Sequence, residues 1–375
     1  MFSVSLVLAD LLQMTFRMKL LLRAIIPLML TATAAGQNRQ FEKAMNSGRE
    51  AFRAANYAEA ERYLRSAVDI AEATKASDTD KSAALSDLAH ALLGQDRLAE
   101  SEKLFERALE IVRSSPTVDR RRIPLVLNNL GALYRLTERY VRSESLLTEA
   151  RKLTEQELGP EHAPMASVLN NLGVLYLMTN RRKLAEATLK QALVLSEKEV
   201  VPDYPDNALI LNNLAALYMR KKKWDLAEPL LRRALQIIET QLSPEHPDAA
   251  FTLISLGLVY EGRNKLVESE KALRRALHIH RKVSRAGSPG IAVAGSNLAN
   301  VLTAQGHYIE AQTLYVESLG ILDENPEQRE LDAPTVMEMF ARLLRLRGNE
   351  EAKAMEARAK SIRTRLGYTV PAQGR

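Results

Sequence analysis

Residues 212–235 read NNLAALYMRKKKWDLAEPLLRRAL, and this stretch specifies the fold. On the first side of the basic turn, Leu214, Ala215 and Tyr218 recur at intervals of one and three residues, which places them on one stripe of a helix. On the second side, Ala227, Leu231 and the following Ala234 form a similar stripe. The stretch therefore predicts two amphipathic helices joined by a short turn.

The same pattern recurs along the chain at a spacing of 42 residues. A leucine followed by a small residue marks each copy, at Leu88-Ala89, Leu130-Gly131, Leu172-Gly173, Leu214-Ala215, Leu256-Gly257 and Leu298-Ala299, with a weaker Phe340-Ala341. An earlier copy begins near Gly48. We expect seven clear repeats and one degenerate C-terminal repeat over residues 37–366, followed by a flexible tail at 367–375. No copy can bury its apolar face alone, so neighbouring repeats must share one core.

These residues carry a resemblance to a known repeat family. The pattern of each copy resembles the tetratricopeptide repeat. It reads small–x–x–Tyr, then an aromatic residue or Leu at the turn, and then small–x–x–x–Leu–x–x–Ala, and residues 212–235 match it best. The linkers at 158–162 and 242–248 are similar to those of the 42-residue subtype of kinesin light chains. The resemblance implies an all-α, right-handed α-solenoid whose first helices line a concave groove for a protein or peptide partner. The heptad coiled coil of a true kinesin light chain is absent from the sequence, so the resemblance does not extend to motor transport.

Composition and motifs exclude several function classes. The 375 residues contain no cysteine, which excludes disulfides, zinc ribbons, iron–sulfur ligation and a thiol nucleophile. The net charge of +6 is modest for this length and does not indicate nucleic-acid binding. There is no H-E-x-x-H, no G-x-S-x-G and no phosphate-binding G-x-x-x-x-G-K-[ST] motif. We therefore predict a non-enzymatic protein without catalytic residues, metal site or cofactor.

The N-terminus has the pattern of a secretory signal peptide. Residues 18–23 form a short basic segment, residues 24–35 carry no charge, and Ala32-Thr33-Ala34 offers a small–x–small cleavage site. We predict a signal peptide over residues 1–36, with translation starting at Met14 or Met18, in a periplasmic or extracellular protein of a bacterium. Two alternatives stay open: an uncleaved anchor in the inner membrane, which would be the only membrane contact, and a cytoplasmic chain.

The candidate peptide-binding residues lie on the predicted first helices, opposite the core stripe. Asparagine occupies one such position in four of six repeats, and its amide can pair with both the N–H and the C=O of an extended peptide. The predicted groove residues are Asn129, Asn171, Asn213 and Asn297, the flanking Arg135 and Arg220, and the apolar Leu125, Val174, Met178 and Leu209. For the preceding asparagines, Asn128, Asn170 and Asn212, packing or hydrogen bonding between repeats is the favoured interpretation.

Two functions remain compatible with this pattern. The first is a scaffold or adaptor that binds a peptide segment of a partner in the groove, either exported or cytoplasmic. The second is a structural spacer of the cell envelope that associates with itself. The last predicted helix, near residues 350–365, is strongly charged and resembles the polar cap that terminal repeats need. A capped array favours a monomer and therefore the first function.

Overall fold

The computed structural model describes residues 39–74, 76–198, 205–283, 287–324 and 326–365. Within these residues the chain forms sixteen α-helices, one short 3-10 turn and no strand, which confirms the predicted all-α solenoid class. The predicted signal peptide and the predicted tail at 367–375 lie outside the described residues. No helix in the described part of the chain is long and apolar enough to cross a membrane.

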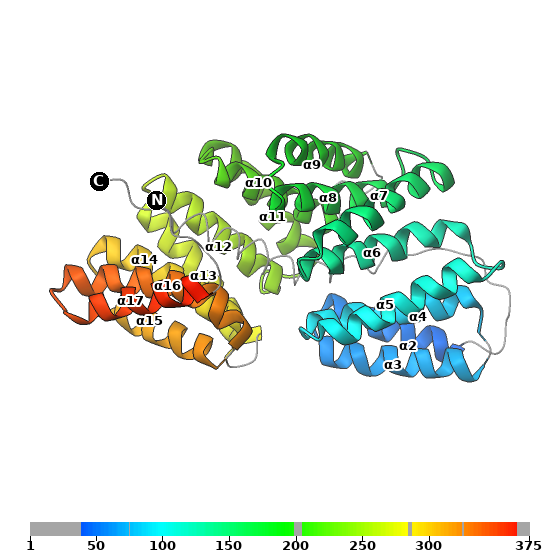
Figure 1. The fold of residues 1–375 in the computed structure, drawn as a ribbon, viewed down its shortest axis with the longest axis horizontal. Coiled ribbons are helices and arrows are strands. Elements are labelled where there is room, and N and C mark those ends of the chain that lie inside the picture. The colour runs from blue at the N-terminus through cyan, green and yellow to red at the C-terminus, as the bar shows by residue number, and fades with distance from the viewer. Residues whose placement is uncertain (1–38, 75, 199–204, 284–286, 325, 366–375) are drawn as a thin grey trace. The chain divides into compact units, whose positions relative to one another are not determined.

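Along the chain, the sixteen helices alternate between first and second helices of the predicted repeats. Figure 1 shows them in order from the N-terminal to the C-terminal helices. The first helices of the pairs are α2 (Arg39–Arg53), α4 (Asp78–Gly94), α6 (Ile123–Leu136), α8 (Ala163–Met178), α10 (Pro205–Arg220), α12 (Pro247–Gly262), α14 (Pro289–Gln305) and α16 (Pro326–Leu346). The second helices are α3 (Tyr57–Ala73), α5 (Leu98–Ser114), α7 (Tyr140–Glu157), α9 (Arg182–Glu197), α11 (Trp224–Gln241), α13 (Leu266–Val283), α15 (Tyr308–Asp323) and α17 (Glu351–Arg365).

The described chain divides into two compact units within α10. The N-terminal unit contains residues 39–217 and the short segment 240–242. The C-terminal unit contains residues 218–239 and 243–365. Each unit is described by itself below.

Within a repeat, the two helices meet at the small residue of the leucine–small pair. A Cβ placed on Gly131 would lie 2.8 Å from Cγ of Leu147, so the helix backbone can approach only because that position carries no side chain. Beside this contact, the hydroxyl of Ser143 donates a hydrogen bond to the carbonyl of Gly131 over 2.7 Å. The same pair of contacts recurs at Gly257, Leu273 and Ser269 in the C-terminal unit. The 42-residue period therefore reproduces individual atomic contacts.

The turns inside the repeats share a left-handed residue, and from Asp96 onward these residues recur every 42 positions. Non-glycine residues adopt a positive φ in six turns, at Ala55, Asp96, Glu138, Asn180, Lys222 and Asn264, and glycine does so at Gly306 and Gly348. This conformation lets the following residue close the first helix, as where the N–H of Arg139 donates to the carbonyl of Tyr134 over 2.8 Å. The left-handed conformation costs a non-glycine residue roughly 1–2 kcal/mol. This requirement leaves no clear signal in the sequence, because most of these residues are not glycine.

Neighbouring repeats share a continuous core within each unit. Second helices pack on the first helices that follow them, as α7 does on α8 and α13 on α14. First helices also contact one another, as in α6 with α8 and α14 with α16. One apolar cluster runs without a break from Leu85 in α4 to Leu175 in α8. The prediction that repeats bury their apolar faces against each other is therefore confirmed.

Arginine–glutamate pairs link the second half of several repeats to the preceding repeat. Arg139, at the start of α7, forms two 2.6 Å hydrogen bonds with Glu102 of α5, and its guanidinium lies 4.1 Å from the ring centre of Tyr134. Arg181 pairs in the same way with Glu144. These pairs are partly exposed, so each contributes less than about 1 kcal/mol to stability.

Candidate binding surface on the first helices

The structure places the ten predicted groove residues in two groups. Leu125, Asn129, Met178 and Arg220 are half-buried on their first helices. The other six are exposed by 3% or less, and they are Asn171, Asn213, Asn297, Arg135, Val174 and Leu209. These six side chains are therefore buried in the free protein, and a contact between the ten residues and a ligand stays a prediction.

The asparagine series forms hydrogen bonds between consecutive repeats. The Nδ2 group of Asn171 donates to Oδ1 of Asn128 in the preceding repeat over 2.8 Å. One repeat later, Nδ2 of Asn213 donates to Oδ1 of Asn170 over 2.8 Å. The interpretation of Asn128 and Asn170 as partners between repeats is confirmed. Asn171 and Asn213 are the other half of the same links, so they connect first helices in the free protein.

Arg135 belongs to this buried network. Its Nη2 lies 3.5 Å from Oδ1 of Asn171, and its Nη1 lies 3.7 Å from Sδ of Met178. Three predicted residues from α6 and α8 are thus brought together. A fully buried guanidinium requires such polar partners, because it has lost its contact with water. Arg135 therefore contributes to the contact between α6 and α8.

An ion pair that the sequence pattern did not predict joins α2 and α4 at the equivalent place. Asp87 occupies the position of Asn171 two repeats earlier, and Arg49 on α2 approaches its carboxylate to 2.7 Å. Burial raises the pKa of Asp87, and the nearby charge of Arg49 opposes this shift. The pair shows that this position faces the preceding first helix whether it carries an amide or a carboxylate.

Asn297 on α14 is the exception in the series. Its Nδ2 donates over 2.8 Å to the carbonyl of Val293 in its own helix. The preceding repeat presents Ile254 at the position that Asn128 and Asn170 occupy, and an isoleucine offers no polar partner. Among the described residues, the Oδ1 atom of Asn297 is buried and accepts no hydrogen bond.

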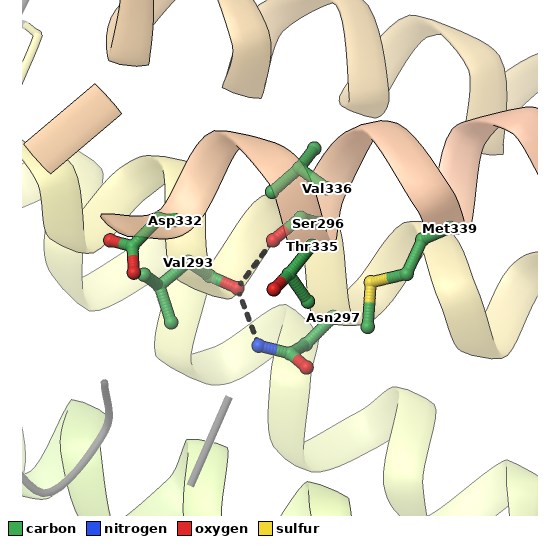
Figure 2. Close-up of a pocket in the computed structure, with 7 residues that line it drawn as sticks. All are labelled: Val293, Ser296, Asn297, Asp332, Thr335, Val336 and Met339. Carbon is green, nitrogen blue, oxygen red and sulfur yellow. Dashed lines mark hydrogen bonds between the residues drawn. The ribbon is translucent and has the colours of Figure 1, made fainter. Parts of the chain in front are cut away.

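A small pocket lies beside this unpaired oxygen, between α14 and α16 (Figure 2). It is partly open and has a volume of about 20 Å³, which is room for one water-sized group. Its lining residues are Val293, Ser296, Asn297, Asp332, Thr335, Val336 and Met339. Figure 2 shows that the hydroxyl of Ser296 and the amide of Asn297 both point to the carbonyl of Val293. The pocket thus combines hydroxyl, amide and carboxylate groups with an apolar wall.

A second polar contact lies one turn further along α14. The Nδ2 group of Asn300 donates to Oε1 of Glu261 on α12 over 2.6 Å. Burial raises the pKa of Glu261, while the charge of Arg342 on α16 and the hydrogen bond from Asn300 oppose that shift. The first-helix face of the C-terminal unit therefore carries a partly desolvated carboxylate close to the pocket.

The polar and apolar groups of the first helices define what this surface can contact. In the part of the chain that the structure describes, no group of three His, Asp or Glu residues is arranged to hold a metal ion. The first helices present amide groups, a few charges and apolar side chains, which can donate and accept hydrogen bonds and pack against a ligand.

Solved structures with a similar fold come from several helical repeat proteins. The apo form of RapI is 12% identical, with 88% of this chain and 99% of that chain covered at a TM-score of 0.55. A signal transduction ATPase with a tetratricopeptide repeat sensor from Pyrococcus horikoshii is 13% identical, with coverages of 88% and 47% and a TM-score of 0.58. A putative kinesin light chain from Podosopora anserina is 21% identical, with coverages of 56% and 99% and a TM-score of 0.47.

The sequence itself matches family models over most of its length. No curated protein matches the sequence. Models described as tetratricopeptide repeat match residues 33–114, 122–198, 206–282 and 291–321, which is well over half of the chain. The matched segments coincide with the helix pairs from α2 to α15. The chain therefore belongs to the tetratricopeptide repeat family.

Proposed function

We propose that this chain is a non-enzymatic adaptor that binds a peptide segment of a protein partner along its first helices. Tetratricopeptide repeats typically mediate protein–protein interactions, and stacked repeats offer an extended surface for a partner. The observation that supports the proposal is the network of buried links between first helices, such as Asn171 with Asn128. These links fix the spacing of neighbouring helices before a ligand arrives, which reduces the entropy lost on binding.

In the N-terminal unit, the residues available to a ligand are the half-buried members of the predicted set. Leu125 and Met178 offer apolar contact area, and Asn129 offers a partly accessible amide. Asn171 and Asn213 are buried beneath this surface, where their hydrogen bonds link consecutive first helices. The proposed contact surface is therefore narrower than the sequence predicted.

Site-specific photo-crosslinking tests this proposal. A p-benzoylphenylalanine residue would replace Met178 on α8 and, in a matched control, the exposed Val194 on the second helix α9. In extracts of the producing cell, we expect a discrete protein adduct from position 178 and a much weaker one from position 194. Equal adducts from both positions, or none from either, would contradict binding on the first helices.

A second candidate function is self-association, as in a structural spacer of the envelope. Three large apolar side chains at one repeat position of the second helices are exposed, and they are Val141 at 86%, Val267 at 72% and Ile309 at 80%. Exposed apolar groups of this size favour contact with another surface. Sedimentation velocity over a range of concentrations decides between the candidates, since an adaptor of the proposed kind is a monomer and a spacer forms oligomers.

The proposed adaptor is an exported protein that acts in the periplasm or outside the cell. The basic segment, apolar run and small–x–small site in the first 36 residues support this proposal. N-terminal sequencing of the mature protein, combined with cell fractionation, tests it. A mature chain that begins near residue 36 in the exported fraction is expected, and an intact N-terminus in the cytoplasm would contradict export.

A further inference from the structure

One face of the second helix α15 is exposed and carries no charged residue. Ile309, Thr313, Val316 and Gly320 are spaced by four, three and four residues, which places them on one stripe of the helix, called the α15 stripe below. All four residues are exposed, Ile309 by 80% and Val316 by 56%. Ser318, half a turn around the helix, is buried. The α15 stripe therefore faces away from the repeat to which α15 belongs.

The α15 stripe differs from the corresponding surface of the other second helices. At the four equivalent positions, each of the other seven carries at least one Asp, Glu, Lys or Arg, as at Lys190 on α9, Arg232 on α11 and Arg274 on α13. Charged residues are usual on the solvent side of a surface helix. An exposed stripe without them favours contact with another surface.

Packing within the chain does not account for the residue types of the stripe. All four rank below Glu, Lys and Arg in helix propensity, and glycine is the least favourable of them. Gly320 has helical backbone, and a Cβ built on it would meet no described atom within 4 Å. Neither backbone conformation nor a described neighbour therefore requires glycine here, in contrast to Gly131. A glycine on an exposed helix face does allow another helix to approach closely.

The polar groups beside the stripe already have partners within the chain. Three acidic residues of α15 form ion pairs with the neighbouring second helices, and they are Glu310 with Arg274, Glu317 with Arg281 and Asp323 with Arg358. The hydroxyl of Thr313 donates over 3.1 Å to the carbonyl of Ile309. Two copies of this face can therefore meet without bringing unpaired like charges together.

The α15 stripe is complementary in shape to a second copy of itself. When two α15 helices pack antiparallel about a twofold axis, positions at equal distances from the centre of the stripe face each other. Ile309 then faces Gly320 of the second copy, and Thr313 faces Val316 of the second copy. The most exposed side chain of the stripe thus meets the position that has no side chain. A second copy supplies this match at both ends of the contact.

We propose that the α15 stripe is a homodimer contact, in which the stripes of two copies pack antiparallel about a twofold axis. A contact made by one helix of each copy is small, so the dimer is weak and reversible. The monomer expected of the adaptor is then the form that predominates at low concentration. A twofold contact closes at two copies, unlike the continuing association of a spacer.

The dimer contact does not rest on the proposed adaptor function. Because the stripe lies on a second helix and faces away from its repeat, the contact leaves the first helices of both copies uncovered. Two joined copies would bind a partner with two target segments more tightly than one copy does, since the second binding event becomes intramolecular.

Sedimentation equilibrium of the full chain from about 1 to 500 µM tests the contact. We expect monomers to convert to dimers and to no larger species. Ile309→Lys and Gly320→Leu should each weaken the dimer about tenfold or more, because they place a charge or a bulky side chain in the contact. Val141→Lys, at the equivalent exposed position of α7, is the matched control and should leave the dimer unchanged. A monomer at every concentration, growth beyond dimers, or a dimer that tolerates both stripe variants would overturn the proposal.

Disulfide crosslinking tests the antiparallel arrangement, because the chain contains no cysteine of its own. Ile309→Cys and Gly320→Cys, mixed under mild oxidation, should form a disulfide that joins the two variants. Either variant alone should crosslink much more slowly, because equal positions of the two helices lie about 16 Å apart along the axis, beyond the reach of a disulfide. Crosslinking of each variant with itself as fast as the mixed reaction would overturn the antiparallel contact.

A photo-crosslinker in the stripe shows which protein covers it in the producing cell. With p-benzoylphenylalanine in place of the exposed Val316, we expect an adduct of twice the mass of the chain. An adduct with a different protein alone would assign the stripe to that protein and overturn the homodimer. Neither outcome bears on the adaptor function, which the crosslinker at Met178 tests separately.

Discussion

The first helices of the two units use the same repeat position in different ways. In the N-terminal unit, buried polar groups at this position have partners in the preceding repeat, as Asn171 has in Asn128 and Asp87 has in Arg49. In the C-terminal unit, the preceding repeat supplies Ile254, and Asn297 turns to its own helix and leaves an acceptor unpaired. The same residue type is a structural link in one unit and an unused hydrogen-bonding group in the other.

The C-terminal unit also contains a buried histidine without a hydrogen-bond partner among the described residues. His280 on α13 is buried beside the ring of Phe251 at a centroid distance of 5.1 Å, and neither of its ring nitrogens has a partner among the described residues. Residue identity alone therefore does not define a role in a repeat protein. The residue at the facing position of the neighbouring repeat decides whether a polar group is satisfied internally or left for solvent, protons or ligands.

The strongest predicted response is a loss of stability of the C-terminal unit in acid. Burial lowers the pKa of His280 to about 4, whereas a histidine in the unfolded chain has the ordinary value of 6.5. His280 is neutral in the folded protein, so its contribution is fully present above pH 6.5 and is lost as the pH falls toward 4, by on the order of 3 kcal/mol. Urea unfolding followed by the fluorescence of Trp224, the single tryptophan and a residue of this unit, measures the effect at each pH.

His280→Phe removes the titrating group and should flatten this pH dependence, whatever its effect at neutral pH. The exposed His278 on the same helix provides the matched control, since His278→Ala should retain the acid sensitivity of the parent. An acid response in His280→Phe as steep as that of the parent protein would show that other groups cause it.

The next prediction in order of size concerns the asparagine links. Asn171→Leu leaves Oδ1 of the buried Asn128 without its donor, so we expect a loss of about 1–3 kcal/mol in the free energy of unfolding. Asn297→Leu removes an acceptor that has no partner, so the change should be close to zero or stabilising. Denaturant unfolding of both variants measures the difference. Equal destabilisation by the two substitutions would remove the contrast between the units.

A third substitution can give Asn297 a hydrogen-bond partner in the preceding repeat, as Asn171 has in the N-terminal unit. Ile254→Asn supplies the partner that the Asn297 position has in the other unit, at the expense of buried apolar area. In a double-mutant cycle with Asn297→Leu, we expect a favourable coupling of about 1 kcal/mol between the introduced amide and the amide of Asn297. A coupling of zero would mean that the facing residue does not control the role of Asn297.

The smallest predicted loss of stability follows from breaking an arginine–glutamate ion pair, and it should be the same in both units. Arg139→Gln breaks the pair with Glu102 in the N-terminal unit, and Arg263→Gln breaks the pair with Glu228 in the C-terminal unit. Both pairs are partly exposed, so each change should cost less than about 1 kcal/mol and diminish as salt is added. Thermal melts at low and high ionic strength measure this. A large difference between the two variants would show that the units also differ outside their first helices.

The sequence predicted the repeats and the contact between the two helices of a repeat better than it predicted which first-helix side chains are exposed. The leucine–small pair at Leu130-Gly131 located the meeting point of the two helices, because a period in the sequence requires a period in packing. Helical geometry placed Asn171 opposite the core stripe, but an angle around one helix axis does not show which neighbouring helix lies there. The left-handed residues at Asp96 and Glu138 were missed because their side chains carry no distinctive signal for that conformation.

The contact of Gly131 with Leu147, and its equivalent at Gly257, bears on how such a gene can change. A deletion of 42 residues between equivalent points in two first helices would join the N-terminal part of one helix to the C-terminal part of the other. The joined helix would still present a small residue to the leucine that follows it, so a complete repeat would remain. Recombination within the gene can therefore shorten or lengthen the protein in whole repeats, and the length of the surface formed by the first helices can evolve without a change of fold.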